Sequence, residues 1–220
     1  GETLGEDPFM VGNMGAAMIN GFQQGDFTGT QKVIACVKHL IGGGESINGL
    51  NAAPADISLR TLREIHLPPY KKAIDAGVYS IMAAHNEING IPSHMSKWLM
   101  TDLLRNEWDF KGFYVSDWLD IERINTLHTT AKDMKEASYL SVAAGMDMHM
   151  HGPFFTDAII ESVKEGTLSI NRVNEACHKI LTAKFNLGLF ENRFVDLEKK
   201  GELLFTEEHK TTALESARKG

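Results

Sequence analysis

The sequence predicts an α/β fold in which parallel strands alternate with helices as part of a (β/α) barrel. Four short runs of apolar residues are typical of strands that are buried on both faces of a parallel sheet. Successive runs begin roughly 35 to 45 residues apart, which is the length of one strand–helix unit. Each run ends in polar residues. The predicted strands are 33–37, 78–83, 112–116 and 146–150.

Helical patterns fill the intervals between these runs, with apolar residues recurring at three- and four-residue spacing. Proline removes a hydrogen bond inside a helix, so Pro68 and Pro69 should break or kink the second helix. Gly145 and Gly166 should end two others, because glycine readily adopts the left-handed conformation of a helix stop. The predicted helices are 10–23, 58–76, 97–108, 132–144, 156–165 and 171–187, with Ser96 and Ser169 as N-terminal caps.

The polar residues at the strand ends favour a barrel over an open sheet. In a parallel barrel, ligands bind at the C-terminal ends of the strands, whereas an open doubly wound sheet binds them only where the strand order reverses. Here four successive strands each end in ionisable or hydrogen-bonding side chains. These ends are Lys38-His39, His85-Asn86, Asp117-Trp118, and His149 with His151.

The chain is expected to divide into two parts. Residues 1–190 carry four strand–helix units, about half of the 250 or so residues that an eight-stranded barrel needs. Residues 191–220 begin as a polar linker, 191–202, and continue into a helix, 206–218, that should open a further domain. The remainder of a longer parent chain is therefore expected to complete the barrel.

The composition narrows the range of partners. The net charge is −7, the isoelectric point is about 5.7, and basic residues do not cluster. Nucleic acid and anionic lipid are therefore poor candidate ligands, and a neutral substrate fits better. No apolar run reaches the length of a membrane-spanning helix, so no membrane partner is predicted.

Asp117 is the strongest candidate for a catalytic residue. A carboxylate at the mouth of a barrel can act as a nucleophile, a base or a metal ligand, or can cap a helix. Lys38 and His39 can bind a sugar or a phosphate, or can be a solvated lysine beside a buried histidine. The glycine-rich loop 42–44 lacks the lysine and hydroxyl residue of a phosphate-binding P-loop.

The histidines suggest a metal hypothesis. His149 and His151 would face the same side of a strand, and three more histidines precede them at strand ends and in loops. However, the sequence has neither a His-Glu-x-x-His motif nor a cluster of paired aspartates, so no metal ligand is assigned. The histidines considered are His85, His94, His128, His149 and His151.

Six motifs occur in the order found in one enzyme family. The chain resembles glycoside hydrolase family 3, and within it the β-glucosidase and exo-glucan hydrolase branch, over nearly its whole length. The motifs are Gly5-Glu6-Asp7-Pro8, Val37-Lys38-His39, Leu62-Arg63-Glu64-Ile65-His66-Leu67-Pro68-Pro69-Tyr70, Asn89-Gly90-Ile91-Pro92, Val115-Ser116-Asp117-Trp118 and Leu187-Gly188-Leu189-Phe190.

The resemblance implies a TIM-like (β/α) barrel followed by an α/β sandwich domain, and it assigns roles to residues. Asp117 matches the nucleophile of the family. Lys38 and His39 match the pair that hydrogen-bonds sugar hydroxyls, Trp118 matches an aromatic residue of the sugar site, and Met82 matches a residue packed beside the nucleophile.

The chain also departs from the family pattern. His85 stands where many relatives carry a tyrosine that hydrogen-bonds the nucleophile, so His85 is expected to take over that role or to alter substrate choice. The general acid of this branch is a glutamate of the second domain, outside these residues. The loop 41–46 lacks the Gly-His-Gly and Asp-Ser-His pattern of the N-acetylglucosaminidase branch.

The expected function is that of a retaining, exo-acting β-glycosidase that releases terminal sugars from an oligosaccharide or β-glycoside. It would need no metal or organic cofactor. A barrel that binds sugar without hydrolysing it, and a metal-dependent barrel hydrolase, remain as alternatives. By resemblance to relatives, a periplasmic or secreted location is expected.

Overall fold

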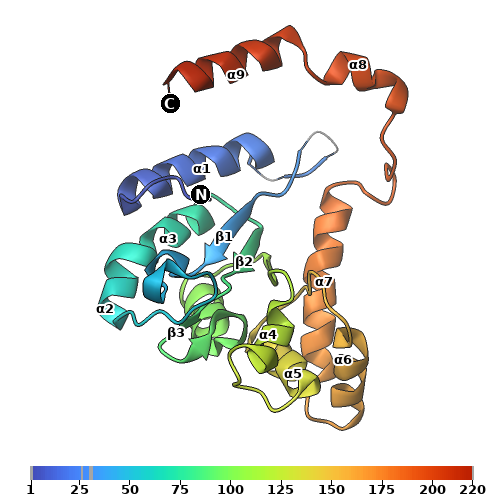
Figure 1. The fold of residues 1–220 in the computed structure, drawn as a ribbon. Coiled ribbons are helices and arrows are strands. Elements are labelled where there is room, and N and C mark those ends of the chain that lie inside the picture. The colour runs from blue at the N-terminus through green and yellow to red at the C-terminus, as the bar shows by residue number, and fades with distance from the viewer. Residues whose placement is uncertain (1, 26, 30–31, 220) are drawn as a thin grey trace.

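The structure is a computed structural model that describes residues 2–25, 27–29 and 32–219, so the outermost residues of the two predicted domains, 1 and 220, lie outside it. A parallel sheet has the order β1 (Cys36–Leu40), β2 (Ser80–Ala83) and β5 (Phe113–Val115) (Figure 1). The predicted parallel α/β fold is confirmed. Within the described residues the sheet does not close into a barrel.

Two predicted strands differ in detail. The first begins at Cys36, three residues later than predicted, and runs to Leu40, so Lys38 and His39 lie within the strand instead of after it. The segment predicted as a fourth strand forms only one bridge, in which Met148 pairs with Val115 in parallel. Both errors have one cause, because an apolar run shows burial but does not show which residues find backbone partners.

The helices follow the predicted order. The Pro68-Pro69 pair does divide the second helix, since both prolines stand at the start of α3. The helical elements are α1 (Pro8–Gln23), α2 (Leu59–Thr61), η3 (Leu62–His66), α3 (Pro68–Asp75), η5 (Trp98–Glu107), α4 (Asp120–Thr126), α5 (Met134–Ala144), α6 (Phe155–Lys164), α7 (Ile170–Asn186), α8 (Lys200–Leu203) and α9 (Glu207–Lys219), with single turns η1 (Gly43–Glu45), η2 (Ile47–Gly49), η4 (Ser93–Met95) and η6 (Leu197–Lys199).

Side-chain caps fix where several helices begin. The Asp7 carboxylate accepts a hydrogen bond from Phe9 N at 2.7 Å at the start of α1. Asp133 caps α5 and Ser169 caps α7 in the same way. These caps satisfy backbone N–H groups that have no partner in the first turn of a helix. Gly145, with φ 127°, follows α5 as predicted.

Several small elements were not predicted from the sequence. A hairpin joins β3 (Glu87–Ile88) and β4 (Ile91–Pro92) through Asn89 and Gly90, both at positive φ. Asn-Gly is the typical turn of a two-residue hairpin. Helix α4 begins three residues after Asp117. In the predicted linker, residues 197–203 form η6 and α8, although residues 191–205 are exposed throughout.

The main core lies around the sheet, where buried side chains from β1, β2 and β5 meet those of η5 and α3. Leu40, Ile81 and Tyr114 are completely buried. Helix α1 packs along α3, and α5 packs against α4 and α6 (Figure 1). This packing holds the C-terminal ends of the three strands next to one another, which fixes the position of the polar residues there.

A buried ionic cluster joins the segment 146–150, which was predicted as the fourth strand, to two helices. The Asp147 side chain is fully buried and accepts hydrogen bonds from Arg105 on η5, from Arg172 on α7 at 2.5 Å and from Tyr114 N at 2.9 Å. Lys179 Nζ lies 3.7 Å away. One buried carboxylate thus balances three cations from two helices, and it ties α7 to the sheet.

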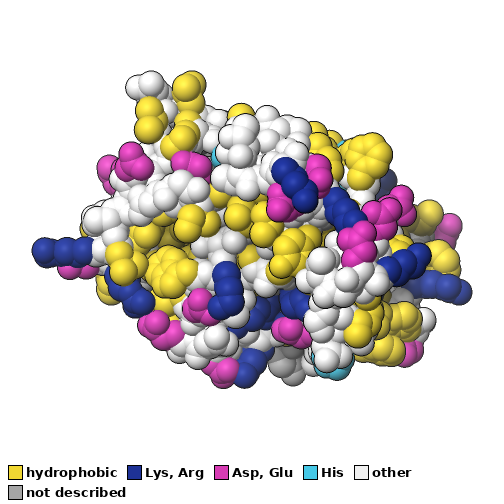
Figure 2. All heavy atoms as spheres, turned by 90° about the horizontal axis from the view of Figure 1, so that it is seen from below, with side chains coloured by type: hydrophobic (Ala, Val, Ile, Leu, Met, Phe, Trp, Pro, Cys, Tyr) yellow, Lys and Arg dark blue, Asp and Glu magenta, His cyan; other side chains and the backbone are white. Residues whose placement is uncertain are grey.

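The surface carries charges of both signs. On the face seen from below, Lys and Arg side chains are interspersed with Asp and Glu and with apolar side chains, instead of gathering by sign (Figure 2). Within the described residues, no helix combines the length and apolar character needed to cross a membrane.

Candidate active site

Asp117 lies two residues after the end of β5 and is held by the backbone around it. Its side-chain Oδ1 accepts a hydrogen bond from Trp118 N at 2.6 Å, and its own N–H donates to His94 Nε2 at 2.9 Å. The residue is 8% exposed. The second oxygen, Oδ2, is buried and accepts no hydrogen bond within the described chain. Asp117 therefore presents one anchored oxygen and one oxygen free to react.

The free oxygen lies between two imidazoles from neighbouring strands. Oδ2 of Asp117 is 3.2 Å from His85 Nε2 and 3.4 Å from His39 Nε2. The structure thus brings together residues from β1, from the end of β2 and from the end of β5, which were predicted to converge. Burial, and next the neighbouring Lys38 charge, lowers the pKa of His39 below its ordinary value. His39 is therefore held mainly neutral at neutral pH.

A second aspartate, Asp120, was missed by the sequence analysis. Its side chain is 1% exposed, and Oδ2 lies 2.7 Å from His85 Nδ1. Arg123 donates to Oδ1 of the same carboxylate at 2.7 Å. Burial raises the pKa of Asp120 above its ordinary value, against the opposing effects of His85 and Arg123. The only signal in the sequence was the i, i+3 spacing of Asp120 and Arg123 beside the Asp117 motif.

Lys38 and Met82 lie at the edge of this group. Lys38 is exposed and pairs with Glu2 at 2.7 Å, and Glu2 also lies 3.6 Å from His39. Met82 is half-buried and lies opposite Val115, two residues before Asp117, in the β2–β5 register. Neither residue contacts Asp117 through a recorded polar interaction. Their predicted roles toward a sugar stay predictions.

Trp118 provides a flat aromatic surface beside the carboxylate. It is 52% exposed, and its indole stacks on the His151 ring with centroids 4.1 Å apart and planes 16° apart. Such a surface suits the apolar face of a sugar ring. His149 takes a different partner, since its Nε2 lies 3.3 Å from Glu122.

The sequence matches a family model described as the glycosyl hydrolase family 3 N terminal domain over residues 1–183. The chain belongs to glycoside hydrolase family 3. The match covers the three strands of the parallel sheet and ends within α7.

Curated relatives of this family-3 chain include β-xylosidases and β-glucosidases. A β-xylosidase of Formosa agariphila is 38% identical over 99% of this chain and 32% of its own length. A periplasmic β-glucosidase of Salmonella typhimurium is 32% identical over 90% of this chain and 26% of its own. The chain therefore spans about a third or less of the length of these relatives.

Solved structures agree with this family assignment. The β-glucosidase of Listeria innocua in complex with glucose superimposes with a TM-score of 0.87 and 37% identity, over 94% of this chain and 29% of that one. A β-glucosidase involved in saponin metabolism from intestinal bacteria superimposes with a TM-score of 0.91 and 35% identity, over 97% of this chain and 29% of the other.

Three side chains of this family-3 site lie close enough together to be tested as a metal site. His85, Asp117 and Asp120 bring one nitrogen or oxygen each within 4.8 Å of one another, and no other such group occurs in the described part of the chain. However, the Arg123 guanidinium already lies 3.2 Å from His85 Nδ1 and hydrogen-bonds Asp120. That positive charge would repel a cation at this point. The three residues therefore fit a hydrogen-bonded relay better than a metal centre.

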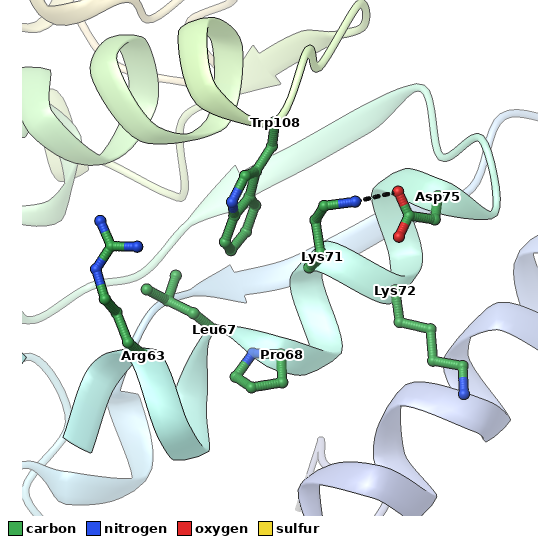
Figure 3. A pocket seen from close by; sticks show the side chains of 7 residues that line it. All are labelled: Arg63, Leu67, Pro68, Lys71, Lys72, Asp75 and Trp108. Carbon is green, nitrogen blue, oxygen red and sulfur yellow. Dashed lines mark hydrogen bonds and ion pairs between the residues drawn. The ribbon is translucent and has the colours of Figure 1, made fainter. Parts of the chain in front are cut away.

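Two hollows on the surface lie away from Asp117. The larger, about 480 Å³, lies between α3 and Trp108 (Figure 3). Its cations already have partners, because Arg63 pairs with Glu107, Lys71 with Asp75 and Lys72 with Asn13. The smaller, about 320 Å³, is lined by the loop 50–54 with Glu87, Leu127 and His128. Neither hollow includes the strand-end group.

The His94 contact predicts an acid sensitivity of the fold. Burial lowers the pKa of His94 to about 3, so the folded protein keeps this ring neutral while the unfolded chain takes up a proton below its ordinary pKa near 6.5. This residue alone should therefore lower the free energy of unfolding by about 1.4 kcal/mol for each unit by which the pH drops between about 6.5 and 3.

The measurement is urea unfolding of the wild type and His94→Gln across this pH range. Glutamine can accept a hydrogen bond from the Asp117 N–H but does not titrate. The free energy of unfolding of the variant should therefore depend less steeply on pH, by the contribution of one proton. Identical pH dependence of the two proteins would contradict the assignment of His94 as a buried neutral acceptor.

Proposed function

We propose that this chain supplies the nucleophile of a retaining, exo-acting β-glycosidase of the β-glucosidase type. The supporting observation is the state of Asp117, whose Oδ2 is buried and without a hydrogen bond while Oδ1 is anchored to Trp118 N. A nucleophile needs an oxygen that is fixed in position and not engaged in a backbone hydrogen bond. Asp117 meets both conditions at the point where three strands end.

The proposed reaction is a double displacement. Asp117 Oδ2 attacks the anomeric carbon, the bond to the departing oxygen breaks, and a general acid protonates that oxygen. Water then attacks the same carbon, the bond to Oδ2 breaks, and the sugar leaves with its original configuration. We place the general acid outside these residues, in the remainder of the complete protein, about 5 to 5.5 Å from the nucleophile, as retaining enzymes require.

Four further residues are proposed to line the sugar site. Lys38 and His39, on β1, would hydrogen-bond its hydroxyl groups, and Lys38 would exchange its contact with Glu2 for the substrate. Trp118 would stack on the ring. Met82, half-buried in β2, would pack beside the reacting centre. These roles require no organic cofactor or metal.

The names of the relatives leave the sugar open between glucose and xylose. Structures of the Listeria innocua β-glucosidase include complexes with glucose and, for a mutant, with laminaribiose. We propose a terminal β-linked glucose or xylose as the substrate. Relatives named periplasmic and lysosomal support action outside the cytoplasm, and the division of this chain into 1–190 and 191–220 remains a prediction.

The complete protein is expected to hydrolyse at least one aryl β-glycoside in a panel of glucoside, xyloside, galactoside and N-acetylglucosaminide. Proton NMR of the first product should show the β-anomer before mutarotation, because two inversions restore the configuration. A first product with the α-configuration would contradict the double displacement. N-acetylglucosaminide as the preferred substrate would contradict the branch assignment.

A second candidate function is sugar binding without hydrolysis. It is favoured by His85, which replaces the tyrosine of many relatives directly beside Asp117. In that case a folded complete protein would bind β-glycosides in calorimetry while turning over none of the panel. Measurable turnover that depends on Asp117 removes this alternative.

A further inference from the structure

Asp120 and His85 form a buried pair beside the candidate nucleophile. We propose that Asp120 is a positioning residue that holds the His85 ring with an Nε2–H toward Asp117 Oδ2, so that the pair stabilises the charge returning to Asp117 when the glycosyl ester breaks. This inference rests on the proposed function. It adds a role for a residue that the strand-end pattern does not contain.

The geometry of the pair is tightly constrained. Asp120 stands in the first turn of α4, three residues after Asp117, and Leu119 at φ 58° turns the chain between them. One Asp120 oxygen lies 2.7 Å from His85 Nδ1, and the other receives the Arg123 hydrogen bond at 2.7 Å. Both oxygens are therefore occupied, so the carboxylate fixes the plane of the His85 ring.

The number of protons on the Asp120–His85 pair determines whether His85 Nε2 directs an N–H or a lone pair toward Asp117. A neutral imidazole carries one N–H, yet both ring nitrogens face a carboxylate oxygen, at 2.7 and 3.2 Å. With a single N–H, one nitrogen lone pair would face an oxygen lone pair. One further proton shared by Asp120 and His85, on either the carboxyl or Nδ1, leaves Nε2–H facing Asp117. Burial raises the pKa of Asp120, which favours retention of that proton.

Apart from Asp117, no described residue in contact with the pair carries a carboxylate. Its neighbours come from β1, η4, α4, the loop after α4 and the end of β5. Those with recorded contacts to His85 or Asp120 are His39 with ring centroids 6.0 Å away, His94 Nε2 at 3.7 Å from Asp120, Arg123 at 3.2 Å from His85 Nδ1, His128 Nε2 at 3.1 Å from the His85 carbonyl, and Asp117 itself.

The kinetic consequence differs between the two steps. A donor facing Asp117 Oδ2 slightly weakens its attack in the first step, but it stabilises the leaving carboxylate in the second. Loss of the donor should therefore slow hydrolysis of the glycosyl ester more than its formation. The ester then accumulates, so kcat and KM fall together while kcat/KM changes less.

The test is Asp120→Ala in the complete protein, assayed on the dinitrophenyl glycoside of the sugar that the panel identifies. Without the carboxylate the His85 ring is no longer held, so we expect kcat to fall about 10- to 100-fold, with a matching fall in KM and a pre-steady-state burst of dinitrophenol. A second variant is Asp120→Asn, whose amide can donate to His85 Nδ1 without titrating, so Nε2–H stays toward Asp117 and the basic limb of kcat should move up by about one pH unit or more.

The matched control is Glu122→Gln, which removes a carboxylate from the same helix and contacts His149 instead of His85. It should keep the wild-type basic limb and the wild-type KM. If Asp120→Ala does not fold, His85→Leu removes the same donor and should show the same burst and fall in KM.

An unchanged basic limb in Asp120→Asn, or a kcat loss in Asp120→Ala with unchanged or raised KM and no burst, would overturn the role of Asp120. Failure of the proposed function has a different signature. In that case Asp117 variants would retain activity or the covalent intermediate would form elsewhere, whatever the Asp120 variants do.

Discussion

Replacing Asp117 with alanine is expected to lower kcat for aryl β-glycoside hydrolysis in the complete protein by about 10⁴-fold or more, because the step that forms the covalent intermediate disappears. The loss should not come from unfolding. The side chain contributes one recorded hydrogen bond, to Trp118 N, and its backbone contact with His94 does not depend on the carboxylate.

The matched control for this experiment is Asp102→Ala, which removes an exposed carboxylate of η5 whose partner is Lys97. It should retain wild-type kcat. Added azide should partly rescue Asp117→Ala by entering the space left by the carboxylate, and the product should be the α-glycosyl azide. If Asp117→Ala is folded and fully active, Asp117 is not the nucleophile.

The largest expected effect on stability is at Asp147. Asp147→Asn should lower the free energy of unfolding by about 3 to 5 kcal/mol, because two nearly buried arginines lose the carboxylate that balances them. The Arg105 and Arg172 side chains are 12% and 14% exposed, so water cannot replace that charge. Urea denaturation followed by circular dichroism measures the shift in the midpoint.

Glu175→Ala provides the comparison for Asp147→Asn. Glu175 contacts Arg172 and Lys179, two cations near Asp147, but its side chain is 49% exposed. Because exposed ion pairs contribute about 1 kcal/mol or less, this variant should unfold close to the wild-type midpoint. Equal shifts for the two variants would show that burial of Asp147 is not the source of the effect.

The sequence pattern predicted the central part of the site because strand ends in a parallel sheet meet at one edge. His39, His85 and Asp117 were expected together on that ground, and Oδ2 of Asp117 lies within 3.4 Å of both imidazoles. Periodicity, prolines and glycines likewise predicted the longer helices of residues 1–190, and their bounds differ by one or two residues in most cases.

The remainder depends on tertiary contacts that no local pattern contains. Asp120 looked like an ordinary residue of a helix start, and only the position of His85 reveals its partner. The fourth apolar run resembled the other three, yet it finds a single bridge to Val115. Helix α4 was missed because seven residues are too few to display an amphipathic period.

Trapping the covalent intermediate tests the central claim most directly. The complete protein would be treated with a 2-deoxy-2-fluoro glycoside that carries a good leaving group, digested and analysed by tandem mass spectrometry. Our account predicts one added fluorosugar on the peptide that contains Val115-Ser116-Asp117-Trp118, localised to Asp117. A label on any other carboxylate, Asp120 included, would contradict the assignment of Asp117 as the nucleophile.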